Sequence, residues 1–178
     1  GPLLEWLTEH RGVARPEPPA ALQVLWITPM RALAADTERA LREVARAAHI
    51  PWTVERRTGD TAGSAKARQL RKPPAALVTT PESLALMLSR ENATAFFGGL
   101  RAVVVDEWHE LLGTKRGTLT ELCLARLRGL RPGVRLWGLS ATLGNLDESL
   151  AALVGVALDG TPHPGRLAPL QLQRPEPR

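Results

Sequence analysis

Two periodicities of apolar and polar positions alternate along the chain. Short apolar or β-branched runs predict strands, and stretches in which apolar residues recur every three or four positions predict helices. The predicted strands are 22–27, 52–56, 75–79, 101–106 and 134–139. The predicted helices are 33–48, 62–71, 81–89, 118–130 and 146–153. This alternation is typical of an α/β fold built on a mainly parallel sheet.

The same pattern predicts which side chains form the core. One face of the helix 118–130 carries Leu119, Leu122, Cys123, Leu127 and Leu130. We therefore expect Cys123 to pack in the core rather than to act as a nucleophile. Trp108 and Trp137 lie beside strands, and we expect both to be buried rather than to stack on nucleic-acid bases.

The composition indicates one ordinary domain with a net positive charge. The 178 residues are 44% hydrophobic and 23% charged, as in one ordinary domain. A net charge of +5 favours a polyanionic partner. Nearly all of the basic residues are arginines, which suits bidentate contacts to phosphate, although a GC-rich coding sequence gives the same bias.

The cysteine content and the length of the apolar runs restrict the class of protein. One cysteine excludes an internal disulfide framework and a cysteine-based zinc site, so a reducing compartment is expected. Apolar runs of membrane-spanning length are absent, which predicts a soluble protein without a membrane partner.

An acidic cluster follows the most strand-like run. Asp106, Glu107 and His109 come directly after Val103–Val105. Ligands of open α/β sheets bind at the carboxyl ends of the strands, where one carboxylate suits Mg²⁺ and a second can orient or deprotonate an attacking water. A capped helix start gives the same pattern without catalysis. A second histidine that would complete a His-Glu-x-x-His zinc motif is missing.

Three further motifs close predicted strands. Thr28-Pro29 and Thr80-Pro81 each end a strand and open a helix, and Ser140-Ala141-Thr142 ends the last strand. Backbone N–H groups and hydroxyls at helix starts can bind phosphates, and hydroxyls at neighbouring strand ends could meet His109. Ordinary turns and helix caps explain the same residues.

Taken in order, these motifs resemble the superfamily-2 DExH-box helicases. The matching segments are 106–109 for the Walker B or DExH motif, 140–142 for the Ser-Ala-Thr motif, and 28–33 and 80–84 for two nucleic-acid motifs. Segments 57–61, 115–117 and 138–146 look like the Lhr group, most of all its bacterial branch, the DNA-ligase-associated DExH-box helicases. The resemblance implies a three-layer RecA-like P-loop NTPase fold.

The resemblance also implies roles and partners. Asp106 would hold Mg²⁺ through water, and Glu107 would activate the water that attacks ATP. His109, Ser140, Ala141 and Thr142 would couple the nucleotide state to the nucleic-acid surface. The implied nucleic-acid residues are Thr28, Pro29, Arg31, Arg57, Gly59, Thr80, Pro81, Glu82, Lys115 and Arg116. The implied partners are single-stranded DNA (with RNA or a hybrid as alternatives), a second RecA-like lobe, and a DNA ligase and nuclease in bacterial cytoplasmic repair.

One expected motif is missing from the chain. ATP hydrolysis in this superfamily needs a Gly-x-x-x-x-Gly-Lys-Ser/Thr loop, whose backbone and lysine hold the phosphates. The lysines here are Lys66, Lys72 and Lys115, and none follows a glycine. The first residue is Gly rather than Met, which indicates either a processing scar at Gly1-Pro2 or a piece cut from a longer chain. In the family that the chain resembles, the loop lies just ahead of the segment similar to Leu3–Leu7, so we expect an N-terminal truncation just after the loop. Such a truncation predicts marginal stability and an exposed sheet edge near Leu136.

These observations leave two functions open. We expect residues 1–156 to be part of a first RecA-like lobe and 157–178 to be a connector or atypical tail. The lobe would belong to an ATP-dependent helicase or translocase and would be inactive alone. The alternative is a binding module, derived from a helicase lobe, that grips nucleic acid or protein without catalysis.

Overall fold

The computed structural model describes residues 19–140, 146–155 and 163–165. Its strands are β1 (Val24–Ile27), β2 (Val54–Arg57), β3 (Ala76–Thr79), β4 (Ala102–Val105) and β5 (Arg135–Gly138). Its helices are α2 (Arg31–Ala47), α3 (Gly63–Arg71), α4 (Pro81–Leu88), α5 (Ala93–Phe97), α6 (Trp108–Leu111), α7 (Lys115–Leu130) and α8 (Leu146–Val154). All ten predicted elements are confirmed, while the short helices α5 and α6 were not predicted.

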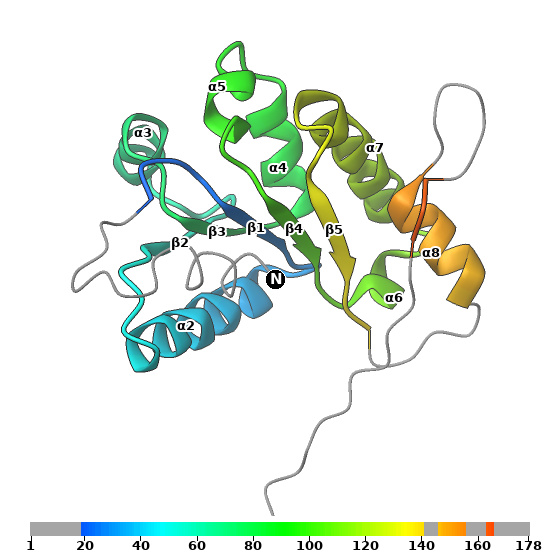
Figure 1. Cartoon of the computed structure of the whole chain (residues 1–178), viewed down its shortest axis with the longest axis horizontal. Helices are drawn as coiled ribbons and strands as arrows, with labels where there is room; N and C mark the ends of the chain where they lie inside the picture. Colours follow the sequence, from blue (N-terminus) through cyan, green and yellow to red (C-terminus); the bar gives the residue numbers. More distant parts are fainter. Residues whose placement is uncertain (1–18, 141–145, 156–162, 166–178) are drawn as a thin grey trace, which may run out of the picture.

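The five strands form one parallel sheet in the order β2-β3-β1-β4-β5 (Figure 1). The register aligns Ile27 of β1 with Thr79 of β3 and with Val105 of β4. The segments that follow these three strands therefore begin at the same edge of the sheet. The predicted motifs at 28–33, 80–84 and 106–109 all start there.

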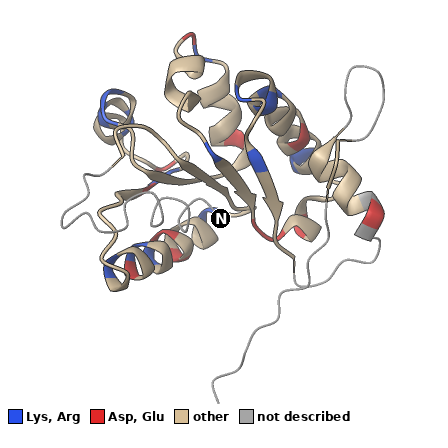
Figure 2. Ribbon diagram, in the orientation of Figure 1, with Lys and Arg blue, Asp and Glu red and all other residues tan. Residues whose placement is uncertain are grey.

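One face of the sheet is covered by α2. This helix packs on β2 and β3, with Ala34 and Ala45 turned inward and basic and acidic residues on its outer side (Figure 2). Val44 belongs to the apolar periodicity from which the helix 33–48 is predicted, but 55% of it is exposed. The reason is that α2 covers β2 and β3 and leaves the same face of β4 and β5 open.

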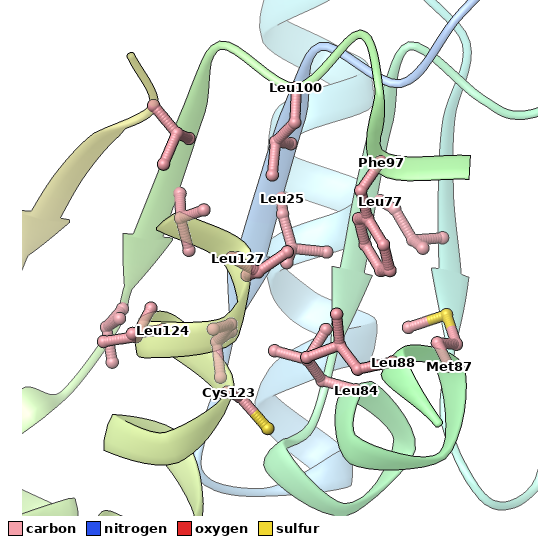
Figure 3. Close-up of a cluster of buried hydrophobic side chains, with 14 of the residues drawn as sticks. Leu25, Leu77, Leu84, Met87, Leu88, Phe97, Leu100, Cys123, Leu124 and Leu127 are labelled. Atoms are coloured by element: carbon pink, nitrogen blue, oxygen red, sulfur yellow. The ribbon is translucent and has the colours of Figure 1, made fainter. Parts of the chain in front are cut away.

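The opposite face carries the larger core. Leu25 and Leu77 of the sheet pack against Leu84 of α4, Phe97 of α5 and Leu127 of α7 (Figure 3). Cys123 is buried in this cluster, as predicted. Helices on both faces of a parallel sheet make the three-layer α/β architecture that the sequence predicts.

The predicted apolar face of α7 is wrong at one position. Leu122 is 64% exposed, while Leu124 and Thr120 are fully buried. The hydroxyl of Thr120 donates to the Arg116 carbonyl at 2.8 Å, so a polar residue is buried with its hydrogen bond satisfied. A search for apolar residues finds most of this face but misses Thr120, because its side chain is polar.

Strand β5 lies at the edge of the sheet, and most of its residues are exposed. This confirms the predicted edge near Leu136 for the part of the chain that the structure describes. The prediction that Trp137 is buried is wrong, because 45% of it is exposed. Trp137 is aligned with Val104, on the face of the sheet that α2 leaves open. Helices able to cross a membrane are absent from the described segments.

Candidate nucleotide and nucleic-acid site

The acidic pair lies where β4 passes into α6. The Asp106 N–H still donates to the Ile27 carbonyl at 2.8 Å, so the sheet pairing continues to this residue. Glu107 then has φ 46° and ψ 46°, a left-handed conformation that non-glycine residues rarely adopt. This turn ends the strand and starts α6, and Figure 2 shows the acidic segment between them. Such backbone strain is concentrated at functional sites.

The carboxylate of Asp106 is held by two donors. Its Oδ1 accepts from the Glu107 N–H at 3.0 Å, and its Oδ2 accepts from the Trp26 indole Nε1–H at 3.1 Å. The residue is half-buried. Each carboxylate oxygen can accept a further hydrogen bond or ligate a cation.

His109 joins the acidic pair to the end of β5. Its Nδ1 lies 2.9 Å from the Ser140 hydroxyl oxygen and 3.4 Å from the Glu107 Oε2, and its Nε2 lies 3.4 Å from the Glu110 Oε1. The structure therefore brings together Glu107, His109 and Ser140, as the sequence predicts. Ala141 and Thr142 lie outside the described residues.

Trp108 fixes α6 in this position. Its backbone N–H donates to the Leu139 carbonyl at 2.8 Å, and its indole N–H donates to the Ser149 carbonyl at 2.9 Å. Only 2% of Trp108 is exposed, which confirms its predicted burial. Trp108 therefore connects the acidic turn to Leu139, just after β5, through its backbone, and to α8 through its buried ring.

The described residues contain no group of three or more His, Cys, Asp or Glu side chains placed to hold a metal. A cation at Asp106 would therefore take most of its oxygens from water or phosphate. Mg²⁺ binds in this way, keeping several waters and using one or two carboxylates. The donor set fits Mg²⁺ and does not fit a protein-only metal cage.

The two Thr-Pro turns are buried. Thr28 is fully buried, and its hydroxyl donates to the Met30 carbonyl at 3.1 Å. Thr80 is 2% exposed, and its hydroxyl lies 3.4 Å from the Ser83 hydroxyl. Pro29 and Pro81 are also buried. These four side chains shape the turns from inside the protein.

Arg57 also points inward. It is 3% exposed and donates to the Lys66 carbonyl at 3.0 Å, with Gln69 Oε1 at 3.4 Å. Burial, with a smaller effect from the charge of Arg90, lowers the pKa of this guanidinium. The expectation that its side chain faces a nucleic acid does not match this placement, because its donors anchor α3 to β2.

Arg31 and Gly59 meet on the surface. A Cβ atom on Gly59 would lie 3.2 Å from Nη2 of Arg31, so the guanidinium rests against the glycine backbone. Arg31 also pairs with Asp60 at 2.8 Å, and the Lys66 ammonium donates to the Gly59 carbonyl at 3.0 Å. Sequence reasoning missed Lys66, because its only signal was its place in a basic helix.

A second charged contact joins α4 to α7. Arg116 binds Glu82 with two hydrogen bonds, Nε to Oε1 at 2.5 Å and Nη2 to Oε2 at 3.1 Å. Partial burial raises the pKa of Glu82, but the hydrogen bond and charge of Arg116, with help from the Glu82 backbone N–H and Thr80, outweigh this and lower it. Lys115 is exposed beside this pair.

Comparison with known proteins identifies the family. The model of the DEAD/DEAH box helicases matches residues 2–149. The chain belongs to the DEAD/DEAH box helicase family. The parallel sheet with helices on both faces is the RecA-like fold of these helicases.

Within this family the chain is similar to Lhr proteins. It is 39% identical over 154 residues to an "ATP-dependent helicase Lhr-Core protein 2" of Thermococcus barophilus, covering 81% of this chain and 18% of that protein. It is 39% identical over 167 residues to a "Lhr helicase/ probable uracil glycosylase" of Mycolicibacterium smegmatis, covering 85% of this chain and 11% of that protein.

A solved structure gives the same result. The structure of Mycobacterium smegmatis helicase Lhr bound to ssDNA and AMP-PNP matches with a TM-score of 0.68 and 38% identity, over 86% of this chain and 21% of that one. The helicase segment described here thus spans less than a quarter of each of these relatives. It is an Lhr-like superfamily-2 helicase segment, as the motifs predict.

Proposed function

We propose that this chain supplies part of the ATP-hydrolysing and nucleic-acid-binding surface of an ATP-dependent DNA helicase or translocase. The observation that carries the proposal is the cluster of Asp106, Glu107, His109 and Ser140 at the carboxyl edge of the sheet. A module that only binds has no need for two adjacent carboxylates at a turn where Glu107 adopts a left-handed backbone conformation. Residues 1–156 would form part of a first RecA-like lobe.

Each member of the cluster has a chemical role in this proposal. Asp106 would hold Mg²⁺ through water, and Glu107 would orient the water that attacks the γ-phosphate of ATP and accept its proton. Mg²⁺ would neutralise charge on the phosphates. His109 and Ser140, with Ala141 and Thr142, connect this centre to the nucleic-acid surface. Glu107 Oε2 lies 3.4 Å from His109 Nδ1, which puts the proposed base in contact with the proposed coupling residue.

Single-stranded DNA is the proposed nucleic acid. The Lhr structure that this chain resembles is bound to ssDNA. The accessible predicted residues are Arg31, Gly59, Glu82, Lys115 and Arg116. Contacts through these residues would go chiefly to phosphates and would carry little sequence information. Thr28, Pro29, Arg57, Thr80 and Pro81 support that surface from beneath.

The wider setting belongs to the same proposal and rests on the resemblance of the motifs to the Lhr group. We propose a bacterial cytoplasmic protein in which a second RecA-like lobe closes the ATP site. A DNA ligase and a nuclease are the proposed repair partners, because the motifs most resemble the ligase-associated branch. Capture of both enzymes by the tagged protein from its own cells tests this part.

The test of the proposed activity uses the whole contiguous protein that the surrounding coding sequence specifies. We expect this protein to be an ATPase stimulated by single-stranded DNA. Glu107→Gln should lower the turnover number about 100-fold or more while leaving ATP binding intact, because general-base catalysis contributes about 10²–10⁴-fold. The 178-residue chain alone should not hydrolyse ATP. An ATPase that Glu107→Gln leaves unchanged contradicts the proposal.

A further inference from the structure

The indole of Trp26 and the carboxylate of Asp106 meet across two strands. Trp26 of β1 is aligned with Val104 of β4, and Asp106 follows Val104 by two residues. Side chains two positions apart share one face of a sheet, so Asp106 projects on the same side as Trp26. The indole N–H bridges the remaining distance toward the strand end and donates to Oδ2 at 3.1 Å.

The ring that makes this contact is held by packing. Trp26 is half-buried and packs on the α2-side cluster, which includes Ala34, Val54 and Val78. Its position is therefore set by the core beneath the site. The indole has a single hydrogen-bond donor, its N–H group, and this donor is directed at the Asp106 carboxylate.

We propose that Trp26 is a positioning residue that fixes the rotation of the Asp106 carboxylate for a divalent cation. The terminal torsion of an aspartate is broad when nothing holds it. Here the Glu107 N–H binds Oδ1 and the Trp26 N–H binds Oδ2, so both oxygens have a defined direction. The proposal rests on the proposed role of Asp106 and adds a residue outside every motif recognised in the sequence.

The first measurement tests the contact in the native sequence. In ¹H–¹⁵N spectra of the 178-residue chain, Asp106→Ala should move the indole N–H resonance of Trp26 and leave that of Trp52 in place. Trp52 precedes β2 at the opposite end of the strands and belongs to the same cluster. A Trp26 indole resonance that does not respond to Asp106→Ala overturns the proposal, even if substitutions of Trp26 itself fail to fold.

The second measurement tests the effect on the cation. Mn²⁺ is used as a paramagnetic probe, and its dissociation constant is obtained from the broadening of the Glu107 backbone amide. Groups that hydrogen-bond a metal ligand change metal affinity about 10–100-fold, so Trp26→Phe should weaken Mn²⁺ binding about tenfold or more. Trp52→Phe removes an indole from the same cluster and should have no comparable effect.

The outcomes separate this proposal from the proposed function. If Asp106→Ala weakens Mn²⁺ binding but Trp26→Phe binds as tightly as Trp52→Phe, the positioning role is wrong and the metal site stands. If Asp106→Ala binds Mn²⁺ like the native chain, both the metal site and the positioning role are overturned. Selective weakening by Trp26→Phe, with the native fold retained in the backbone spectrum, supports the positioning role.

Discussion

The Ser140 hydroxyl lies 2.9 Å from Nδ1 of His109, so the end of β5 contacts the first turn of α6 directly. The same ring lies 3.4 Å from Glu107, the proposed base. A movement of β5 or of the segment that follows it would therefore change the surroundings of the proposed base. This contact gives the structure a direct route between two motifs that lie thirty-one residues apart in sequence.

Ser140→Ala should separate DNA unwinding from ATP hydrolysis in the whole contiguous protein. The variant loses one hydrogen bond worth about 1 kcal/mol, so the fold should survive. We expect unwinding per ATP hydrolysed to fall severalfold, measured by strand displacement and phosphate release in the same reaction. Ser64→Ala, on the exposed start of α3, is the matched control. Equal loss of unwinding and hydrolysis would show that Ser140 has no coupling role.

Arg31→Ala should weaken the binding of single-stranded DNA and reduce its salt dependence. Each phosphate contact that is lost lowers the slope of log affinity against log salt by about 0.7 for a single strand. Arg31 lies against Gly59 and beside Asp60, on the proposed DNA path. Arg39→Ala, which removes an exposed arginine paired with Asp36 on α2, is the matched control variant. Fluorescence anisotropy over a salt series measures both slopes, and identical slopes for the two variants would place the DNA elsewhere.

The ion pair of Glu82 and Arg116 should contribute a pH-dependent part of the stability. The folded-state pKa of Glu82 is lowered, so its contribution is fully present above the unfolded value of 4.5 and is lost as the pH falls through the folded pKa. The pair is about half exposed, so its contribution should stay below about 1 kcal/mol.

Urea unfolding at neutral pH and below 4.5 measures this contribution. Glu82→Gln should flatten the acid side of the stability profile, while Glu91→Gln, at an exposed position after α4, should not. If the native chain and Glu82→Gln lose stability in parallel as the pH falls, the pair does not stabilise the fold.

The sequence predicted the alternation of strands and helices because periodicity is a local property. It also placed Asp106, Glu107, His109 and Ser140 together, because the carboxyl ends of neighbouring parallel strands share one edge. The burial of Arg57 could not be predicted, since it depends on acceptors that α3 supplies from Lys66 and Gln69. The exposure of Trp137 depends on which strands α2 covers. The residues of β5 alone do not indicate where α2 packs on the sheet.

Cys123 should resist thiol reagents until the chain unfolds. Burial raises the pKa of its thiol to about 11, so the reactive thiolate is scarce at neutral and mildly alkaline pH. Labelling with a disulfide reagent should be slow in buffer and fast in denaturing urea, and its rate then reports the opening of the core. Fast labelling in buffer, with no change in the circular dichroism spectrum, would show that α7 opens locally.

Trp108 and Trp137 should differ in their sensitivity to substitution, although both lie close to β5. The Trp108 ring is 3.6 Å from the position of a Cβ atom on Gly138, but it is buried and hydrogen-bonded to Ser149. Removing a buried tryptophan costs about 3–5 kcal/mol, so Trp108→Ala should unfold a marginally stable chain or leave it insoluble.

Trp137→Glu should leave the free energy of unfolding within about 1 kcal/mol of the native value, because its side chain is half-exposed at an edge strand. The substitution places a charge on an apolar surface that also includes Val104 and Val44, on the strand that ends the sheet in the described residues. Charges on edge strands oppose association between sheets, so self-association measured by light scattering should decrease. A large loss of stability in Trp137→Glu would mean that another part of the chain covers this face in solution.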